Sequence, residues 1–208
     1  MKKVAIIQAR SKSTRLPGKV MLNINGTPLI GILYKRLKKS KELDDIIIAT
    51  TKSSTDLIKF LKKNKIKYFV GSEKNVLNRY YKAAVRFKAK IIVRITSDGI
   101  LIDPNLVDKF LRKFKKVKVD YLGNSQPLSY PDGLDIEIFT FKSLRYANLN
   151  AKKNYEKEHV TPFIQKNKKF SKYNFVNEVD QSNIRLTLDE IEDYDSLKKI
   201  FKFFYPNI

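Results

Sequence analysis

Basic side chains are concentrated in one short stretch near the start of the chain. Residues 6–19 read IIQARSKSTRLPGK, and Arg10, Lys12, Arg15 and Lys19 are basic. The apolar, β-branched residues that precede them are typical of a buried strand. Ligands bind beyond the carboxyl ends of strands in an open parallel sheet, so cations placed there could bind a polyphosphate. The alternative interpretation is an ordinary basic turn in a basic protein.

Two aspartates could supply the metal site that a polyphosphate needs. Asp98 follows the apolar stretch 91–95, and Asp189 closes the stretch NIRLTL ahead of a predicted helix. Carboxylates are the hard oxygen ligands that Mg²⁺ prefers. Combined with the basic loop, they would suit a nucleoside triphosphate with Mg²⁺, the metal offsetting charge on the reacting phosphate. Each aspartate could instead be a turn or N-cap residue.

The basic loop matches neither of two common phosphate-binding motifs. It lacks the pattern G-x-x-x-x-G-K-S/T and the pattern G-x-G-x-x-G. This argues against a kinase of the P-loop class and against a dinucleotide-binding dehydrogenase.

The composition favours one globular domain without a specific nucleic-acid partner. The chain has 208 residues, of which 42% are hydrophobic, and a net charge of +22. Such a charge is found in nucleic-acid-binding proteins. Here the basic residues are spread over the polar faces of predicted helices, and no zinc-finger, bZIP or RRM signature is present. We expect the charge to attract anionic substrates instead.

Several absences in the sequence point to a cytoplasmic protein with no membrane partner. No apolar run approaches the roughly 20 residues that span a bilayer. The N-terminal apolar stretch, Val4 to Ile7, is shorter than the roughly 7–15 residues of a signal-peptide core. The chain has no cysteine, which excludes disulfides and thiolate metal ligands.

The first half of the chain alternates between strand and helix patterns. The hydrophobic pattern predicts strands over 3–8, 45–50, 67–70 and 91–95. It predicts helices over 28–39, 54–64, 75–87 and 104–116, the first with Thr27 as N-cap and Pro28 at its first position. Uniformly apolar strands between helices indicate a parallel sheet covered on both faces.

The rhythm changes near residue 120. We expect a strand over 120–124, then a turn at 131–133 that leads into an alternating strand. Helices follow over 141–150 and 155–166, strands over 173–178 and 183–189, and a helix over 192–204. The fold class is therefore α/β, with a mostly parallel central sheet and a small mixed or antiparallel C-terminal part.

Eight motifs together resemble a known family. They resemble the cytidylyltransferase-like proteins of surface-polysaccharide biosynthesis, of the spore-coat polysaccharide type, which are related to acylneuraminate and 3-deoxy-manno-octulosonate cytidylyltransferases. The motifs span nearly the whole chain in the family's order: IIQARSKSTRLPGK with INGTPLI, IIIATT, GSEKNVLNRYY, VRITSDGILIDP, PDGLDIEIF, EHVTPFI and IRLTLDEIEDY.

The resemblance implies a Rossmann-like nucleotidyltransferase fold in a single domain, residues 1–208. Residues 1–118 would form the nucleotide-binding part and 119–208 the part for acceptor binding and dimerisation in a homodimer. The implied activity is Mg²⁺-dependent transfer of a nucleoside monophosphate, usually CMP from CTP, to a sugar acid or sugar phosphate. Pyrophosphate leaves, and the activated sugar serves surface polysaccharide or glycoprotein glycan synthesis.

The resemblance also assigns roles to residues. It makes Lys19, Arg15 and Asp98 catalytic, and Asp98 and Asp189 metal ligands. The residues implied at the nucleotide are Gln8, Ala9, Arg10, Ser11, Lys19, Thr51, Arg79 and Thr96. The residues implied at the acceptor are Asp132, Gly133, Asp135, Glu137, Glu158 and His159.

The sequence allows two interpretations for several side chains. Arg79 could reach the nucleotide or pair with Glu73. Arg94 lies in an apolar strand and needs a partner, for which Asp98 or a phosphate could serve. Lys12 replaces a glycine of the family pattern, and it would be strained if its φ were positive.

The residues implied at the acceptor also allow two interpretations each. Asp135 and Glu137 are two apart on a predicted strand and should face the same side, either a binding edge or a solvated face. His159, the only histidine, could hydrogen-bond the acceptor or a site carboxylate, or be structural.

The activity also has alternatives. The chain could be a guanylyl- or uridylyltransferase acting on a hexose or amino-sugar 1-phosphate. It could use a phosphonate or polyol phosphate as acceptor. A basic nucleic-acid-binding module remains the non-enzyme alternative.

Overall fold

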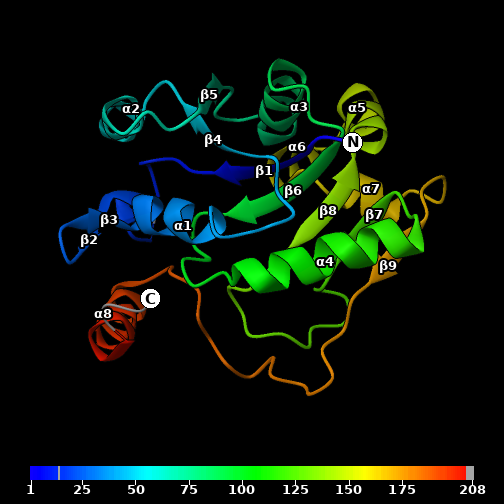
Figure 1. Ribbon diagram of the computed structural model, residues 1–208. Coiled ribbons are helices and arrows are strands. Elements are labelled where there is room, and N and C mark those ends of the chain that lie inside the picture. The colour runs from blue at the N-terminus through cyan, green and yellow to red at the C-terminus, as the bar shows by residue number, and fades with distance from the viewer. Residues whose placement is uncertain (14, 205–208) are drawn as a thin grey trace.

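A computed structural model describes residues 1–13 and 15–204 of the chain (Figure 1). A seven-stranded sheet runs through the middle in the order β5-β4-β1-β6-β8-β7-β9, and β2 and β3 form a separate antiparallel pair. The strands are β1 (Lys3–Gln8), β2 (Asn23–Ile24), β3 (Thr27–Pro28), β4 (Asp45–Thr51), β5 (Tyr68–Gly71), β6 (Ile91–Thr96), β7 (Tyr121–Gly123), β8 (Glu137–Thr140) and β9 (Lys172–Asn174).

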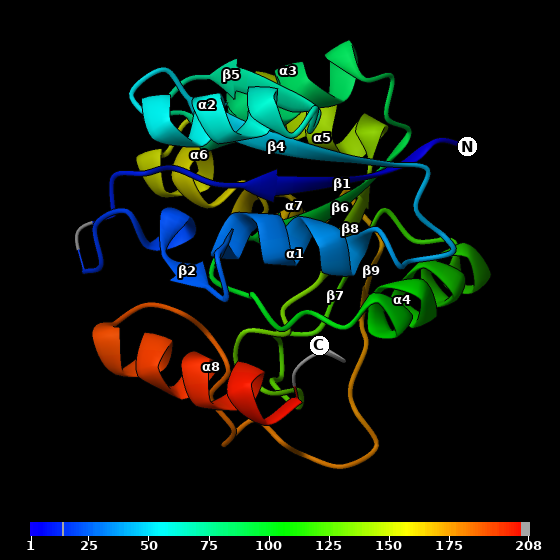
Figure 2. The same cartoon turned by 60° about the vertical axis from the view of Figure 1, so that its left-hand side comes forward.

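Helices cover both faces of the large sheet, as Figure 2 shows. One apolar core joins the sheet to α1, α2, α4 and α8, and a second joins it to α3, α5 and α7. The helices are α1 (Leu29–Leu37), α2 (Thr55–Lys63), α3 (Val76–Arg86), α4 (Pro104–Val117), α5 (Phe141–Asn150), α6 (Asn154–His159), α7 (Pro162–Lys166) and α8 (Ile191–Phe204), with a 3₁₀ turn η1 (Lys19–Met21). None of the helices in the described ranges is long and apolar enough to cross a membrane.

β1 lies where the order of the sheet reverses. From β1 the chain adds β4 and β5 on one side, and it then returns to place β6 on the other side of β1. All of these pairs are parallel, and Gln8 at the end of β1 is in register with Ala49 of β4 and Thr96 of β6. A crevice at such a reversal is the usual ligand site of an open α/β sheet.

The second half of the sheet is mixed, as predicted. β8 pairs antiparallel with both β6 and β7, and β9 pairs parallel with β7. The fold class predicted from the sequence, with helices on both faces of a mostly parallel sheet, is confirmed.

Two helix predictions differ from the structure at their ends. Thr27 and Pro28 belong to β3 instead of opening a helix, and α1 begins at Leu29 without a side-chain cap. The predicted helix over 155–166 is two short helices, because Val160 between them has a φ of 72°. A β-branched residue in that conformation cannot continue a right-handed helix.

The segment 183–189 is not a strand, contrary to its alternating pattern. Its only ladder contact within the described residues is an isolated bridge between Asp132 and Arg185. The backbone bonds instead to two loops: Leu186 N–H donates to the Asp132 carbonyl at 2.8 Å, and Leu188 N–H donates to the Asp98 carbonyl at 3.0 Å. The predicted strand over 173–178 is likewise shorter, since β9 ends at Asn174.

Candidate active site

Lys19 is the centre of a charged cluster beyond the carboxyl ends of β1 and β6. The loop after β1 turns at Gly18, whose φ is 71°, and η1 then presents the Lys19 side chain. Its ammonium lies 3.0 Å from Asp189 Oδ1 and 3.9 Å from Asp98 Oδ2, and it donates to the Leu188 carbonyl at 2.7 Å. The three residues are far apart in the sequence; Lys19 and Asp98 follow strand ends as predicted, and Asp189 follows a segment that forms no strand.

Arg15 extends the cluster toward solvent. Its Nη2 lies 2.9 Å from Asp189 Oδ1, and 58% of its side chain is exposed, against 12% for Lys19. Both predicted phosphate-binding cations therefore contact a predicted metal ligand directly. The cluster is nearly neutral as it stands, and an incoming anion would have to exchange places with a carboxylate.

Backbone packing holds three remote loops together at this point. A Cβ on Gly99 would lie 2.6 Å from the Gly133 carbonyl oxygen, and a Cβ on Gly133 would lie 2.6 Å from the Thr187 nitrogen. Gly133 also has a φ of 98°, a conformation that side chains disfavour. The two glycines let the loops of Asp98, Asp132 and Asp189 meet.

Arg185 connects Asp132 to Asp189 and Asp193, and sequence reasoning missed it. Its guanidinium binds Asp193 at 3.0 and 2.9 Å and Asp132 at 3.0 Å, with Asp189 at 3.8 Å. Arg185, Asp189 and Asp193 recur at intervals of four residues, a signal that could have identified them. The carboxylate of Asp193 also accepts the N–H groups of Asp189 and Glu190 at the start of α8.

These contacts shift the acidity of Asp193. Burial would raise its pKa, but the hydrogen bond from Arg185 and the two backbone N–H groups outweigh burial and lower the pKa to about 2. The carboxylate is therefore ionised at any pH near neutrality, and it fixes the direction of Arg185.

The donor set suits Mg²⁺ bound together with a nucleotide. Asp98 and Asp189 both approach the same ammonium, so a cation of higher charge could replace it between them. In the described ranges, no group of three or more His, Cys, Asp and Glu side chains is arranged to hold a metal alone. Mg²⁺ is commonly held by one or two carboxylates, and substrate phosphates and water complete its shell.

Several residues predicted at the nucleotide lie at the carboxyl ends of β1 and β6. Gln8 ends β1, and its Oε1 is buried without a hydrogen-bond partner in the described structure. Ala9 is buried and its N–H donates to the Ala49 carbonyl, whereas Arg10 is exposed. Thr96 ends β6 beside Gln8. An unpaired buried amide oxygen is costly, and a ligand donor could satisfy it.

Ser11 and Thr51 are tied to α2 and its N-terminal turn. Ser11 N–H donates to Ser54 Oγ at 3.0 Å, and its hydroxyl donates to the carboxylate of Asp56 at 2.6 Å. Thr51 is buried and its hydroxyl lies 3.1 Å from Ser54 Oγ. Ser54 therefore positions both residues at the entrance of the basic loop.

Arg79 is a buried cation without a carboxylate partner among the described residues. It is 2% exposed; Nη1 donates to the Ser72 carbonyl at 2.6 Å, and Nε has no partner. Burial is the main cause that lowers its pKa, and the charge of Arg10 lowers it further. No ion pair with Glu73 forms, so of the two interpretations from the sequence only the nucleotide contact remains open.

Arg94 and Glu137 form a separate buried cluster. Arg94 Nη1 pairs with Glu137 Oε2, and the other oxygen of Glu137 accepts from Tyr121 at 2.7 Å and Thr161 at 2.6 Å. The expectation that Asp98 or a phosphate pairs with Arg94 is wrong. Gln165 adds a third hydrogen bond to the same oxygen at 3.1 Å, so both oxygens of Glu137 have partners inside the protein.

Asp135 lies between the two clusters. It precedes β8 instead of lying in a strand with Glu137, so the shared-face argument fails for this pair. Burial raises its pKa, and the nearby carboxylates of Asp132, Glu137 and Asp98 raise it further. It is the predicted site carboxylate whose affinity for a proton is increased.

The remaining predicted residues lie apart from the charged cluster. Glu158 and His159 are exposed on α6, and no hydrogen bond or ion pair links their side chains to another predicted site residue in the described ranges. The ring of His159 lies 4.6 Å from that of Tyr155. Lys12 is exposed and is not among the residues with positive φ, so its replacement of a glycine causes no backbone strain.

Comparison with known proteins places this cluster in a family context. A family model described as cytidylyltransferase matches residues 4–205. An uncharacterized protein of Methanocaldococcus jannaschii, MJ1063, is 39% identical over 98% of this chain and 85% of its own length. The spore coat polysaccharide biosynthesis protein SpsF of Bacillus subtilis is 32% identical over 95% of this chain and 85% of its own.

Solved structures with the same fold also include cytidylyltransferases. A cytidylyltransferase from Leptospira borgpetersenii has a TM-score of 0.93 at 37% identity and covers 98% of this chain and 88% of its own. CMP:2-keto-3-deoxy-manno-octonic acid synthetase in complex with CTP has a TM-score of 0.75 at 17% identity, over 98% of this chain and 99% of its own, which supports the fold. A nucleotidyltransferase enzyme accounts for the charged crevice better than a nucleic-acid-binding module. With a family match over nearly its whole length, this chain belongs to the cytidylyltransferase family.

Proposed function

We propose that the protein transfers CMP from CTP to a sugar acid or sugar phosphate with Mg²⁺, and that it thereby makes an activated sugar for surface polysaccharide or glycan synthesis. The observation that carries the proposal is the contact of Lys19 with both Asp98 and Asp189 beyond the reversal point of the sheet. The similarity to SpsF and, over 52% of this chain, to a 3-deoxy-manno-octulosonate cytidylyltransferase of Geobacter metallireducens supports this acceptor class.

The reaction is an in-line displacement at the α-phosphorus. An acceptor oxygen forms a bond to that phosphorus while the bond to the oxygen bridging the β-phosphate breaks, and pyrophosphate leaves. Lys19 and Arg15 hold the negative charge that grows on the leaving pyrophosphate, for which fixed cations in a partly enclosed cleft are well suited. Mg²⁺ bound by Asp98 and Asp189 would neutralise charge on the reacting phosphate.

Substrate binding requires the ion pairs of the cluster to rearrange. Lys19 would exchange Asp189 and Asp98 for phosphate oxygens, while Arg15, more than half exposed, would swing with its loop. Arg79 and Arg10 would add cations on the nucleotide side, where Gln8 offers an unpaired amide oxygen. Asp132, Gly133 and Asp135 would line the acceptor side.

The acceptor decides whether the enzyme needs a base. A phosphate oxygen is already ionised, but a sugar hydroxyl must lose its proton as it attacks. We propose that the carboxylate of Asp135 takes this proton, because its raised pKa makes it a stronger base than an ordinary aspartate. Mg²⁺-assisted loss of the proton is the alternative for the same acceptor.

We also propose that the protein forms a homodimer. Residues 1–118 would bind the nucleotide, and residues 119–208 would bind the acceptor and contact the second copy. Exposed Leu128 lies on a loop whose residues hydrogen-bond the segment that carries exposed Val176 and Val179, through contacts such as Asn177 N–H to Ser129 Oγ at 2.8 Å. Light scattering at micromolar concentration should give twice the monomer mass of 24.3 kDa. A monomer at that concentration would contradict this part of the proposal.

The activity is tested by pyrophosphate release. The screen combines CTP, GTP, UTP and ATP with sugar acids and with sugar 1-phosphates, in Mg²⁺ and in EDTA. We expect release only with CTP, Mg²⁺ and an acceptor of one of these classes. Preference for GTP or UTP with a hexose or amino-sugar 1-phosphate would replace CTP in the proposal, and a phosphonate or polyol phosphate acceptor would replace the sugar.

A separate variant tests whether Asp98 binds the metal. Asp98→Asn should abolish turnover far more than it weakens binding of CTP in a thermal-shift titration, because it removes a carboxylate that would hold Mg²⁺ at the reacting phosphate. Asp195→Asn is the matched control, since Asp195 lies on the surface of α8 and, within the described ranges, pairs with Lys198 alone. Pyrophosphate release by Asp98→Asn at the wild-type rate would refute the assignment.

A further inference from the structure

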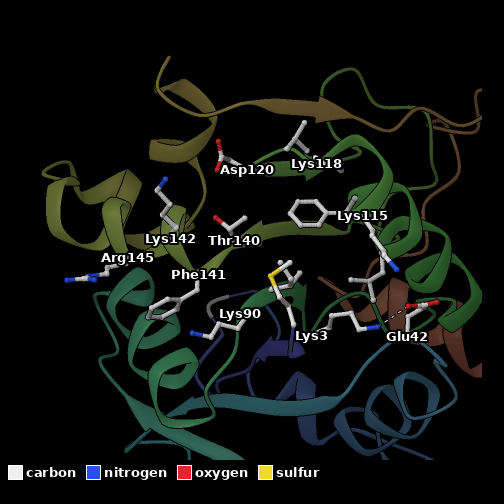
Figure 3. Close-up of a pocket in the computed structure, with 15 residues that line it drawn as sticks. Lys3, Glu42, Lys90, Lys115, Lys118, Asp120, Thr140, Phe141, Lys142 and Arg145 are labelled. Carbon is white, nitrogen blue, oxygen red and sulfur yellow. Dashed lines mark hydrogen bonds and ion pairs between the residues drawn. The ribbon is translucent and has the colours of Figure 1, made fainter.

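A cavity of about 840 Å³ lies at the opposite end of the sheet from the charged cluster. It opens where β1 and β6 begin, between the last turn of α4 and the first turn of α5 (Figure 3). β6 runs six residues from this cavity to the active-site end, which is about 16 Å at ~3.3 Å per residue. A molecule bound here would not occupy the nucleotide crevice.

The wall of the cavity is apolar. Ile91, Leu111 and Phe114 line it while being at most 6% exposed, and Val119 and Phe141 complete the surface. Drug-sized ligands occupy cavities of roughly 300–1,000 Å³ with walls that are mostly apolar. The volume and the lining are therefore those of a small-molecule site.

The rim of the cavity is strongly basic. Lys90, Lys115, Lys118 and Lys142 line it, are exposed, and form no ion pair with any described residue. In Figure 3 these cations come from several sides of the hollow, Lys142 from α5 and Lys115 from α4. Their charges are available to a ligand.

The acidic residues at the rim are already engaged. Glu42 is bound by Lys3 at 2.9 Å, as the dashed line in Figure 3 shows, and Asp120 accepts from the N–H and hydroxyl of Ser171 at 3.1 and 3.0 Å. Lys3 therefore compensates the charge of Glu42, whereas Asp120 keeps its charge and forms no ion pair with a described residue, which leaves one carboxylate against the four rim lysines. The site combines an apolar wall with an excess of unpaired cations.

We propose that this cavity binds a small amphipathic anion, a molecule with an apolar body and a phosphate or carboxylate group. The apolar surface is recessed, so it accepts a body that enters it and cannot itself insert into a bilayer. The apolar part of the ligand would contact Ile91 and Phe114, while the anionic group would lie among the rim lysines. The inference does not depend on the proposed reaction, because none of these residues belongs to the charged cluster.

Octyl phosphate, kept below its micelle concentration, is the probe. We expect it to bind the full chain with one site in calorimetry, and to bind less tightly as salt is raised. Inorganic phosphate and 1-octanol, each of which offers one half of the chemistry, should bind at least tenfold more weakly. Asp98→Asn should bind octyl phosphate as the wild type does, which separates this site from the catalytic proposal.

Two variants test the cavity itself. Lys90→Glu combined with Lys142→Glu should weaken binding of octyl phosphate at least tenfold, and Lys62→Glu with Lys63→Glu, the same charge change on exposed residues of α2, should alter it less than twofold. Val119→Trp should block the cavity and abolish binding. Melting curves establish that each variant is folded.

Three outcomes would overturn the proposal. Equal binding to both double variants would place the anion elsewhere, and equal binding of 1-octanol would show that the rim charges have no role. Binding only to vesicles of anionic phospholipid, without binding of the monomeric probe, would make this end of the molecule a membrane-contacting surface instead.

Discussion

Two charged clusters flank the end of β6 and differ in how completely they are satisfied. In the strand-end cluster of Lys19, Asp98, Asp189 and Arg15, side-chain exposure rises from 12% at Lys19 to 31% at Asp98 and 58% at Arg15. In the buried cluster around Glu137, both of its oxygens are used by neighbouring side chains. Lys19 is as enclosed as Arg94, at 12% and 13% exposure, so the clusters differ in Asp98 and Arg15, whose exposed charges a substrate can reach. The Glu137 carboxylate, at 9% exposure, is instead held on both oxygens by protein donors.

Removing the Lys19 ammonium should have the largest effect on activity and tests the role of the strand-end cluster. Lys19→Met should lower turnover roughly 10²–10³-fold, the usual cost of losing one group that stabilises charge in the transition state. Unfolding free energy should fall by no more than about 1 kcal/mol, because Asp98 is 31% exposed and Arg15 still pairs with Asp189, so neither carboxylate is left as an uncompensated buried charge. Lys12→Met, in the same loop but outside the cluster, is the control for both pyrophosphate release and urea unfolding. A fully active Lys19→Met enzyme would remove the strand-end cluster from the mechanism.

The buried cluster should respond in the opposite way. Glu137→Gln leaves Arg94 as an uncompensated buried charge, which typically costs about 3–5 kcal/mol of unfolding free energy. Arg94→Met with Glu137→Met should recover much of that loss, since an apolar pair needs no desolvated charge. Urea unfolding measures both. A stable Glu137→Gln protein with a raised KM for the acceptor would instead return Glu137 to the acceptor side, as the sequence predicted.

Asp135 lies between the two clusters, and its substitution should affect both stability and the pH dependence of activity. Its pKa is raised, so the folded state binds the proton more tightly than the unfolded chain, and the fold loses stability as pH rises through that window. Asp135→Asn should therefore raise the melting temperature at pH 7 by up to roughly 2–4 °C, equivalent to about 1 kcal/mol at this length. It should also remove the acidic limb of the pH–rate profile with a hydroxyl acceptor. An unchanged profile would assign the proton to a different acceptor group.

The smallest expected effect belongs to Asp193, which orients Arg185 from outside the cluster. Its pKa of about 2 lies below the ordinary value of 3.8, so its contribution to stability is present above the ordinary value and lost as pH falls through 2. The melting temperature of the wild type should fall over that interval more steeply than that of Asp193→Asn. Identical slopes would show that the contacts to Arg185 do not persist in solution.

The parallel half of the fold was predictable because its signal is local. β1, β4, β5 and β6 are each mostly apolar, and the helices α1 to α3 between them each have an apolar stripe. The edge at which ligands bind then follows from the connectivity, which placed Lys19 and Asp98 together, whereas Asp189 was placed there through a predicted strand over 183–189 that does not form.

The features that the sequence did not predict depend on contacts between residues far apart in the chain. The alternation in 183–189 resembles a strand, yet its N–H groups bond to loops rather than to a ladder. The spacing of Arg185 from Asp189 and Asp193 could have indicated their pairing, but its contact with Asp132, 53 residues away, could not be read from the local sequence. Arg94 likewise takes its partner from Glu137, across the antiparallel pairing of β6 with β8. Local patterns carry no information on such pairs.

The contact between Lys19 and Asp189 joins residues 170 positions apart. A ribosome adds roughly 5–20 residues per second, so many seconds separate the synthesis of the two. The strands β1, β4 and β6 are complete once residue 96 has been synthesised, yet the second carboxylate follows only after β7, β8 and β9. A nascent chain can therefore assemble the parallel part of its sheet early, while it completes the charged cluster only once Asp189 has emerged from the ribosome.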